Sequence, residues 1–305
     1  MKHFLNLSDL GKEGLLKVLD VADNLKATRG TPEAPQPLRG KQIALVFEKA
    51  STRTRLSLEV AVSELGAHPI VLTSTGSQLG RGEPMKDTAR VLGRMVHGIT
   101  LRTSDESRIK TMVEYSGVPV LNALTDQSHP MQLLADLMTV RRHFGQLENL
   151  SCAWIGDGNN MASSWIEAAG LLGFQLQLAC PQGYEPDPVF LDQARSRGAK
   201  ILVTTNPQEA VAGAHVISTD VFASMGQEGE AENRLKDFAG FQLNSQLLNH
   251  ADSKAVVLHC LPAHRGEEIA EDVLEGPQSL VWDEAEARLH TSKSVLLWVF
   301  DQLPD

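Results

Sequence analysis

The sequence is poor in cysteine and contains no long apolar run. Its 305 residues include three cysteines, Cys152, Cys180 and Cys260, and no C-x-x-C pair. An odd, sparse set does not indicate a disulfide framework, and the missing C-x-x-C pair argues against a structural zinc site. The N-terminus holds no apolar signal core, and no apolar run approaches the ~20 residues that span a bilayer. These absences predict a soluble protein of the reducing cytoplasm.

Basic residues are also scarce relative to acidic ones. Lys and Arg number 28 against 38 Asp and Glu, which gives a net charge of −10. A globally acidic protein is a poor candidate for non-specific binding to nucleic acid or anionic membranes, because both need a basic surface. The balance still allows a local basic pocket for a small anion. Hydrophobic residues make up 42% and charged residues 22%, which is typical of a globular protein with a substantial core.

Short apolar runs alternate with longer amphipathic segments, and this alternation predicts an α/β fold. Short runs bounded by Gly, Pro or polar residues are typical of buried parallel strands joined by helical crossovers. The predicted strands are Gln42–Phe47, Pro69–Leu72, Gly98–Arg102, Val118–Ala123, Ser151–Ile155, Gln175–Cys180, Lys200–Thr204, Ala214–Thr219, Ala255–Cys260 and Ser279–Trp282. Predicted helices cover Leu56–Gly66, where Gly66 is a stop signal, Met131–Phe144 and Ser163–Leu172.

The length of the chain favours two domains. A predicted helix ends at Phe144, a polar segment follows, and a new strand begins at Ser151, so we place the boundary between residues 145 and 146. The expected domains are 1–145 and 146–284, each a mainly parallel sheet flanked by helices. The last segment, about 285–305, is amphipathic and apolar enough to form a C-terminal helix that packs back on the N-terminal domain.

The stretch Ser51–Arg55, Ser-Thr-Arg-Thr-Arg, follows a predicted strand and opens a predicted helix. Backbone N–H groups and the helix dipole make such a position an anion site. Three hydroxyls and the guanidinium of Arg53 would complete a phosphate cradle, although the glycines and the Gly-Lys pair of a Walker A loop are missing. The alternative is a capped helix with solvated arginines. Because capping needs only one Ser or Thr, the number of polar groups favours the anion site.

Two further polar stretches follow predicted strands. In Ser128–Gln132, His129 and Gln132 flank a proline suited to the first helical turn. Taken alone, this stretch is explained more simply by a helix start with surface polar residues. In Leu258–Gly266, Cys260 lies among two histidines and an arginine, which would lower the pKa of the thiol if they are close in space. The alternatives are a small core cysteine, or a His/Cys metal site whose spacing fits no common zinc pattern.

The second half of the chain adds two more such stretches. Gly156–Met161 begins like G-x-G-x-x-G, but Met161 replaces the third glycine, so a dinucleotide site is weakly supported. In Thr219–Gly226, Asp220 suits an ammonium group and the backbone of Ser224–Gly226 suits a carboxylate, unless the segment is a plain surface loop. All five stretches lie just past predicted strands, where open α/β sheets bind ligands. Both halves are therefore expected to contribute loops to one cleft shared between the domains.

These motifs, in this order, resemble a known family. Ser51–Arg55, His129–Gln132, Asp220 with Ser224–Gly226, and His259–Pro262 look like the ornithine branch of the aspartate/ornithine carbamoyltransferases, and the likeness runs over nearly the whole chain. The broader family shares the first two motifs, whereas the Ser-Met-Gly loop and the cysteine resemble the ornithine branch. The resemblance implies a carbamoyl-phosphate domain (1–145 with the C-terminal helix), an ornithine domain (146–284), and a homotrimer with active sites near the subunit interfaces.

The resemblance also implies the site residues. Carbamoyl phosphate would be bound by Ser51, Thr52, Arg53, Thr54, Arg102, His129, Gln132, Cys260, Leu261 and Arg288, with Gln78 supplied by a neighbouring subunit. Ornithine would be bound by Asn160, Asp220, Ser224 and Met225. Cys260, Arg102, His129 and Arg53 are the expected catalytic residues. The segments Arg81–Pro84 and Ala162–Ser164, after Gln78 and Asn160, depart from the family pattern, so the resemblance does not fix the geometry of those loops.

The implied reaction transfers the carbamoyl group of carbamoyl phosphate to the δ-amine of L-ornithine, giving L-citrulline and phosphate, in arginine biosynthesis or the urea/arginine pathway. It needs no metal or organic cofactor, because carbamoyl phosphate is already activated. A sibling carbamoyltransferase acting on putrescine or N-acetylornithine is the nearest alternative. An NAD-dependent dehydrogenase is disfavoured by the missing third glycine, and a non-catalytic paralogue by the retention of every motif residue.

Overall fold

The computed structural model describes residues 1–76, 78–223 and 228–304. It divides the chain into two compact units, unit 1 (Met1–Met138 with Glu286–Asp305) and unit 2 (Thr139–Ala285). Each unit is a parallel sheet flanked by helices, which confirms the predicted α/β class with two sheets. Unit 1 ends seven residues before the boundary that we placed after residue 145 (145 − 138 = 7). Two helices, α5 (Pro130–Phe144) and α12 (Val281–Val299), continue from one unit into the other.

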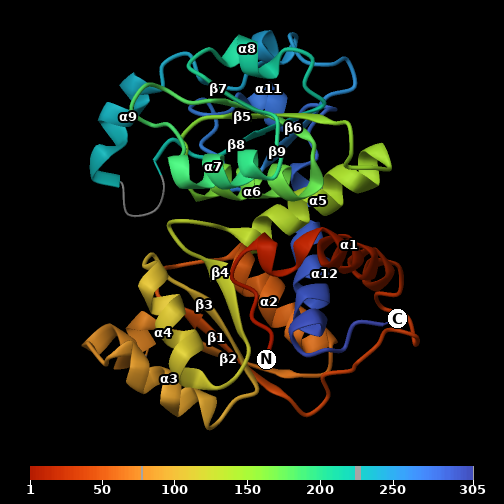
Figure 1. Ribbon diagram of the computed structural model, residues 1–305, viewed down its shortest axis with the longest axis vertical. Helices are drawn as coiled ribbons and strands as arrows, with labels where there is room; N and C mark the ends of the chain where they lie inside the picture. The colour runs from red at the N-terminus through yellow and green to blue at the C-terminus, as the bar shows by residue number, and fades with distance from the viewer. Residues whose placement is uncertain (77, 224–227, 305) are drawn as a thin grey trace. The chain divides into compact units, whose positions relative to one another are not determined.

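Unit 1 contains four parallel strands in the order β2-β1-β3-β4. They are β1 (Gln42–Phe47), β2 (His68–Thr73), β3 (Gly98–Arg102) and β4 (Val120–Leu124). The other elements are η1 (Leu7–Asp9), α1 (Gly11–Ala27), α2 (Arg53–Glu64), η2 (Ser74–Gly76), η3 (Gln78–Arg81), α3 (Met85–Gly93) and α4 (Glu106–Ser116). In Figure 1, α3 and α4 cover one face of the sheet, and α2 and α12 cover the other. Burial on both faces explains why β1 and β3 are nearly continuous apolar runs.

Unit 2 contains five parallel strands in the order β7-β6-β5-β8-β9. They are β5 (Ser151–Ile155), β6 (Gln175–Ala179), β7 (Ile201–Thr204), β8 (Val216–Thr219) and β9 (Val256–His259). The helices are α6 (Asn160–Leu172), α7 (Pro188–Ser196), α8 (Pro207–Val211), η4 (Glu228–Glu230), α9 (Ala231–Asp237), α10 (Ser245–Leu248) and α11 (Glu271–Leu274). Figure 1 shows α6 and α7 on one face of this sheet and α8 and α11 on the other.

Each sheet has a topological switch point, where consecutive connections run in opposite directions. In unit 1 the chain moves from β1 outward to β2, and from β3 outward to β4, so the switch lies between β1 and β3. In unit 2 it lies between β5 and β8 for the same reason. Ligands of open α/β sheets bind outside the carboxyl ends of the strands at such points. The fold therefore marks the loops after β1 and β3, and after β5 and β8, as candidate sites.

Most predicted elements are present, and one strand prediction is wrong. The predicted bounds of β1, β3 and β5 agree with those of the structure, and Gly66 ends α2 with a φ of 83°. Ser279–Trp282 is not a strand, because its pairing with β9 stops at the single bridge between Val257 and Ser279. Helix α12 begins at Val281 instead, and acidic residues in its first turn favour a helix start through the helix dipole.

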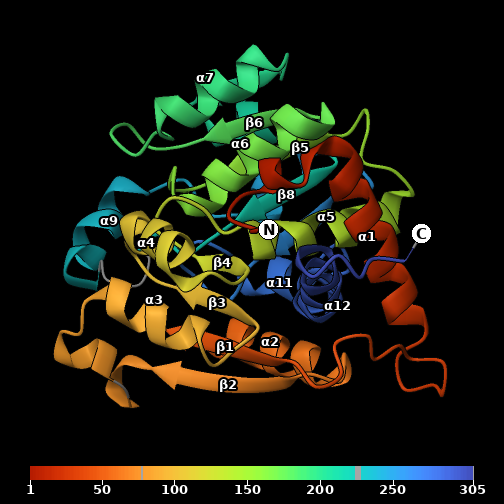
Figure 2. The same cartoon turned by 60° about the horizontal axis from the view of Figure 1, so that its bottom comes forward.

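The C-terminal helix packs on the N-terminal part of the chain, as predicted. Within unit 1, Lys293 Nζ lies 2.7 Å from Glu64 Oε2 on α2. Lys26 Nζ on α1 lies 2.9 Å from Glu286 Oε2. Figure 2 shows α12 between α1 and α2. Residues near the end of the chain therefore lie next to α2, the helix at which the Ser-Thr-Arg-Thr-Arg motif ends. Among the described residues, no helix combines the length and apolar character that a membrane span requires.

Candidate active site

The register of the unit 1 sheet places the first motif beside Arg102. Phe47, the last residue of β1, pairs with Arg102, the last residue of β3. Residues 48–52 then lead into α2, which begins at Arg53. The Ser-Thr-Arg-Thr-Arg stretch therefore lies at the switch point of unit 1, as its position in the sequence predicts.

The hydroxyl of Thr54 is the centre of a buried polar cluster in unit 1. Arg102 Nη1 donates to Thr54 Oγ1 at 3.2 Å, and Arg288 Nη2 donates to the same oxygen at 2.6 Å. All three side chains are buried, with 2–6% of their surface exposed. Two guanidinium groups that converge on one neutral oxygen repel each other, and an anion bound between them would relieve that repulsion. The structure thus brings together three predicted phosphate ligands that are far apart in the sequence.

His129 belongs to the same electrostatic environment. Burial, followed by the positive charges of Arg288 and Arg102, lowers the pKa of this imidazole well below its usual value of 6.5. His129 is therefore neutral near pH 7, and it can donate one hydrogen bond without adding a third positive charge. That property suits a polarised carbonyl oxygen near a phosphate that already faces two guanidiniums.

The other residues of unit 1 that were predicted to bind carbamoyl phosphate differ in their exposure. Arg53 is half-buried, and its Nε atom has no hydrogen-bond partner among the described residues. Ser51 is half-buried and Thr52 exposed in the turn before α2. Gln132 is buried on α5, one turn after His129. An unsatisfied guanidinium N–H at the first residue of α2, next to Thr54 in the sequence, fits a site that takes an anionic ligand.

Gln78 stands apart from the Thr54 cluster. It is exposed in the short helix η3. No hydrogen bond or ion pair between described residues joins it to Thr54, Arg102 or Arg288. The structure of the single chain therefore leaves the predicted role of Gln78 at a neighbouring subunit's site as a prediction.

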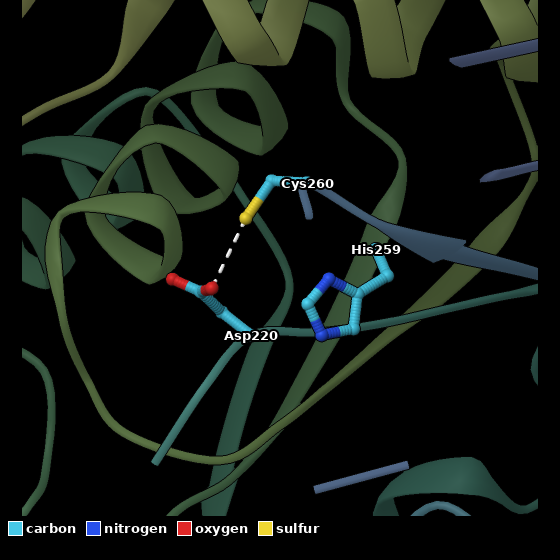
Figure 3. A group of neighbouring side chains, drawn as sticks. All are labelled: Asp220, His259 and Cys260. Carbon is cyan, nitrogen blue, oxygen red and sulfur yellow. Dashed lines mark hydrogen bonds between the residues drawn. The ribbon is translucent and has the colours of Figure 1, made fainter. Parts of the chain in front are cut away.

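In unit 2, the register aligns the residues that follow β8 and β9. Thr219 pairs with His259, so Asp220 and Cys260 come next at the same level. Cys260 Sγ donates to Asp220 Oδ1 at 3.0 Å (Figure 3), and the backbone N–H of Val221 donates to the same oxygen at 2.8 Å. Since an ionised carboxylate only accepts, the shared hydrogen belongs to the thiol. Asp220, predicted to bind ornithine, and Cys260, predicted to be catalytic, thus form one carboxylate–thiol pair.

The other two thiols are unsuited to chemistry. Burial raises the pKa of Cys180 to about 12, and it raises that of Cys152 as well. Both side chains are fully buried, whereas Cys260 is half-buried. Thiols in apolar surroundings remain protonated and inert, so Cys260 is the cysteine that the structure leaves for function.

The imidazole of His259 does not approach the thiol as a charged neighbour. Its Nδ1 accepts the backbone N–H of Leu261 at 2.8 Å, so the proton is assigned to Nε2, which lies 3.0 Å from Glu268 Oε1. This bond holds Leu261 at a φ of 56°, a left-handed conformation that costs energy for leucine. Arg265 forms ion pairs with carboxylates of α11 and the residue after it. We expected basic side chains near the thiol of Cys260. The structure instead places the carboxylate of Asp220 in contact with it.

Two groups of side chains present donor atoms that lie close enough for a metal. Asp220, His259 and Cys260 form one, and His264, Glu267 and Glu268 form the other, with donor atoms within 4.8 Å of one another. In the first group, both ring nitrogens of His259 are engaged within the protein. In the second, Glu268 Oε1 accepts from His259 and from the backbone of His264. Internal hydrogen bonds account for both groups.

Sequence reasoning missed Asn159, which lies next to the predicted Asn160. The side-chain oxygen of Asn159 caps α6 by accepting from Met161 N at 2.9 Å. Its Nδ2 donates to Asp220 Oδ2 at 3.0 Å. Asn159 therefore ties the loop after β5 to the loop after β8 across the switch point. An N-cap residue is a signal that sequence analysis can find, but its second bond depends on the tertiary fold.

Arg234 was missed as well. This buried guanidinium donates through Nη1 to Asp157 Oδ2 at 2.7 Å and to the carbonyl of Phe222 at 2.9 Å. Burial raises the pKa of Asp157, although the charge of Arg234 opposes the shift. Arg234 thus joins the loop after β5 to the segment that leads into Ser224–Gly226. The predicted residues Ser224 and Met225 themselves lie outside the described residues.

The two glycines of the Gly-Asp-Gly stretch serve the backbone rather than a dinucleotide. A Cβ atom on Gly158 would lie 2.3 Å from the backbone nitrogen of Pro186. The N–H of Gly158 donates to the carbonyl of Tyr184 at 2.8 Å. In a dinucleotide fingerprint, the second glycine leaves room for a pyrophosphate. Here, the backbone of Glu185 and Pro186 in the same chain occupies that space, which argues against the dehydrogenase alternative.

Comparison with known proteins places the chain among carbamoyltransferases. Two family descriptions match the chain, the aspartate/ornithine carbamoyltransferase carbamoyl-P binding domain over residues 2–142 and the Asp/Orn binding domain over residues 148–299. A Geobacter metallireducens protein named ornithine carbamoyltransferase is 50% identical over 296 residues, covering 97% of this chain and 98% of its own.

Solved structures give the same result. Ornithine carbamoyltransferase from Pyrococcus furiosus has a TM-score of 0.93 and 43% identity, covering 99% of this chain and 98% of its own. The anabolic enzyme from Campylobacter jejuni also has a TM-score of 0.93, with 39% identity and coverage of 99% and 100%.

The fold and the two sites define the class of protein. This is a two-domain α/β protein that carries a cationic cluster at one switch point and a carboxylate–thiol pair at the other. The chain belongs to the aspartate/ornithine carbamoyltransferase family, which confirms the family resemblance of its motifs.

Proposed function

We propose that this protein transfers the carbamoyl group of carbamoyl phosphate to the δ-amine of L-ornithine. The observation that carries the proposal is the cluster in which Arg102 and Arg288 converge on Thr54, together with the separate Cys260–Asp220 pair. One arrangement suits an acyl phosphate and the other an ammonium or amine. Relatives about 50% identical over nearly the whole chain bear the name ornithine carbamoyltransferase.

The cationic cluster binds the phosphate in this proposal. Ser51, Thr52, Arg53 and Thr54 supply N–H, hydroxyl and guanidinium donors at the start of α2, where the helix dipole also favours an anion. Arg102 and Arg288 add two buried guanidiniums. As the carbon–oxygen bond to phosphate breaks, negative charge grows on the leaving oxygen. Fixed positive groups at that oxygen stabilise the transition state more than the ground state.

The carbonyl oxygen is stabilised by neighbouring donors. Arg102 and neutral His129 donate to it as it becomes an oxyanion, while Gln132, Leu261 and Cys260 contact the rest of the carbamoyl group. Removal of one donor from such an oxyanion site costs about 3–4 kcal/mol of barrier in enzymes where it has been measured. A neutral His129 can act as a donor across the neutral pH range, because its pKa is depressed.

The carboxylate–thiol pair of Asp220 and Cys260 binds and orients the δ-amine of ornithine in this proposal. A primary amine with a pKa of about 10.4 is neutral in only about one molecule per thousand near pH 7.5, which adds roughly 4 kcal/mol to the barrier. Asp220 and Cys260 orient the amine and couple it to proton loss, and a desolvated site favours its neutral form. The neutral nitrogen then attacks the carbonyl carbon and forms the carbon–nitrogen bond. The bond from that carbon to the phosphate oxygen breaks, and the proton of the nitrogen passes to the departing phosphate. No covalent cysteine intermediate is required.

The remaining predicted residues hold the α-groups of ornithine and complete the assembly. Asn160, Ser224 and Met225 bind the α-amino and α-carboxylate groups, which would distinguish ornithine from putrescine. A homotrimer places Gln78 of one copy at the active site of the next. The product would serve arginine biosynthesis, a role suggested by the name of the anabolic relative from Campylobacter jejuni.

The direct test is citrulline formation by the purified chain from carbamoyl phosphate and four amines: ornithine, putrescine, N-acetylornithine and aspartate. We expect product with ornithine in large excess over the other three. A preference for putrescine or N-acetylornithine would move the protein to a sibling activity. Absence of product with ornithine would overturn the proposal, and light-scattering mass measurement checks the trimer separately.

A further inference from the structure

The N-terminal segment of unit 1 runs beside β4, the last strand of the sheet. Phe4 forms a parallel bridge with Leu121, and the segment is drawn in red next to this strand in Figure 1. The N–H of Phe4 donates to the carbonyl of Val120 at 2.9 Å, and the N–H of Asn122 donates to the carbonyl of Phe4 at 2.7 Å. The start of the chain therefore lies against the strand that leads to His129.

Asn122 is a polar residue in an otherwise apolar strand, and only 1% of its surface is exposed. Its Nδ2 donates to the carbonyl of Leu5 at 3.0 Å and to Ser128 Oγ at 3.1 Å. Its Oδ1 has no hydrogen-bond partner among the described residues. Burial of an amide whose oxygen is unsatisfied costs stability, and an apolar side chain would avoid that cost. The two bonds that Asn122 donates therefore indicate a role outside packing.

The hydroxyl of Ser128 joins Asn122 to the N-terminal segment. It accepts from Asn122 and donates to Asn6 Oδ1 at 2.9 Å, and a hydroxyl is able to do both at once. The backbone of Ser128 is fixed as well. Its N–H donates to Thr125 Oγ1 at 3.2 Å, and its carbonyl accepts from the N–H of Thr125 at 3.0 Å. Ser128 is thus held by the turn after β4 and by the N-terminal segment.

His129 lies between this fixed serine and the start of α5, where its carbonyl accepts from the N–H of Leu133 at 3.2 Å. We infer that Asn6, Ser128 and Asn122 are positioning residues that hold the imidazole of His129 for its contact with the carbamoyl carbonyl. The inference rests on the proposed function. Displacement of a catalytic group by about 1 Å can lower a rate by about 10²-fold, so bonds outside the site can control the rate.

The variant Ser128→Ala removes the shared hydroxyl and leaves the backbone bonds in place. We expect kcat for citrulline formation to fall about tenfold, while the KM values of both substrates stay within about twofold. The affinity for phosphonoacetamide, a stable analogue that joins a phosphonate to the same amide group, should change less than kcat does, because the positioned donor acts most strongly in the transition state.

The matched control is Ser116→Ala, at a buried serine of α4 whose hydroxyl donates to the carbonyl of Val118 at 3.3 Å. Both variants lose one buried hydroxyl, so both should lower the urea midpoint of unfolding by a similar amount. The control should change kcat by less than about twofold, because its hydroxyl has no link to His129. An equal loss of kcat in the two variants would overturn the inference.

A double-variant cycle tests whether Ser128 acts through His129. The cost of Ser128→Ala in kcat should disappear in a His129→Ala background, since no imidazole remains to be positioned, and the same cost retained there would overturn the inference. Asn6→Ala removes the acceptor at a half-buried position and should lower kcat about threefold, whereas Asn6→Asp keeps an acceptor oxygen and should stay within about 1.5-fold of the wild type. If Ser128→Ala does not fold, equal kcat values for Asn6→Ala and the wild type would overturn the inference.

The outcomes separate this inference from the proposed function. A wild type that forms no citrulline contradicts the proposed function, and crystal structures then test the positioning role by themselves. In Ser128→Ala, the imidazole of His129 should be displaced by about 1 Å or adopt more than one conformation, whereas in Ser116→Ala it should superimpose on the wild type. A single, undisplaced imidazole in Ser128→Ala overturns the inference whether or not citrulline forms. If the wild type forms citrulline and Ser128→Ala keeps its kcat, only the positioning role is wrong.

Discussion

The two switch points of this molecule share an architecture and carry opposite charge. In unit 1, Arg102 at the end of β3 and Arg288 on α12 both donate to the hydroxyl of Thr54, in the first turn of α2. In unit 2, Asn159 after β5 and Cys260 after β9 both donate to the carboxylate of Asp220, which follows β8. Parallel sheets of similar topology supply the position in both cases. The residues in the loops decide whether the position receives an anion or an amine.

This contrast explains how an acidic protein can bind a phosphate. The net charge of −10 describes the whole surface, whereas the unit 1 site depends on a few buried guanidiniums. Buried charges interact through a lower dielectric than surface charges, so local composition outweighs the total. The net charge therefore bears on binding to large anionic surfaces such as nucleic acid, and it says nothing about small anions.

The largest effect is expected from removal of a cation in unit 1. Arg102→Ala should lower kcat for citrulline formation by about 10²–10³-fold, because one donor to the leaving group or oxyanion is lost. Ornithine binding should change little, since unit 2 keeps its carboxylate–thiol pair. Arg39→Ala, at an exposed arginine of unit 1, should change kcat by less than about twofold. A comparable loss in both variants would remove the distinction between the buried cluster and the surface charges.

Removal of the buried cation of unit 2 should act on stability instead. Arg234→Met leaves Asp157 without its ion-pair partner, and we expect the free energy of unfolding to fall by about 3 kcal/mol, because Asp157 keeps some contact with solvent. Urea titration measures this change. Arg234→Met/Asp157→Leu should recover part of the loss, because no lone buried charge remains. A larger loss in the double variant would contradict the ion-pair explanation.

Asn159→Ala should have a smaller effect than Arg234→Met, and the effect should be confined to the ornithine side of the site. The variant loses the N-cap of α6 and the bond to Asp220, which together are worth about 1–2 kcal/mol. The KM for ornithine should rise, while the KM for carbamoyl phosphate stays within about twofold. Steady-state kinetics with each substrate varied in turn separates the two constants. A rise in the KM for carbamoyl phosphate alone would contradict the placement of Asn159 on the ornithine side.

The smallest effect is a pH dependence carried by buried histidines of unit 1. Burial lowers the pKa of His290, and that of His129 as well, below the usual 6.5. The unfolded chain therefore binds more protons than the folded one below pH 6.5, so the free energy of unfolding falls as the pH is lowered. Each histidine contributes at most about 1.4 kcal/mol per pH unit.

His290→Gln tests the sign of that effect. Urea titrations at pH 7 and pH 5.5 should show a smaller drop in the free energy of unfolding for the variant than for the wild type. Carboxylates with lowered pKa values, such as Glu64 and Glu286, titrate at still lower pH and leave this window clear. An equal drop in both proteins would show that the buried imidazole does not drive the dependence.

Much of the fold could be predicted from the sequence, because its signals are local. Apolar runs between Gly and polar residues located β1, β3 and β5, and Gly66 marked the end of α2. Ser279–Trp282 was mistaken for a strand since four apolar or small residues carry no information on whether a sheet has a place for them. The following acidic turn was the better signal.

For the site as well, local features could be predicted from the sequence and contacts between distant residues could not. The position of Ser51–Arg55 after a strand follows from sequence, but the partner of Thr54 is Arg288, on a helix 234 residues away, and only the resemblance supplied it. Arg234 was missed because an arginine in a short polar helix normally faces solvent. Asn159 was missed in favour of its neighbour, since capping is a local property and the bond to Asp220 is not.

Hydrogen–deuterium exchange of the full chain with phosphonoacetamide tests the central contrast most directly. The account predicts that the ligand slows exchange chiefly in residues 50–56, 100–104, 128–133 and 286–290 of unit 1. Ornithine added afterwards should extend protection to residues 157–161, 219–222 and 258–262 of unit 2. Protection by phosphonoacetamide that appears first in the unit 2 loops, with none around Thr54, would contradict the assignment of anion and amine to separate switch points.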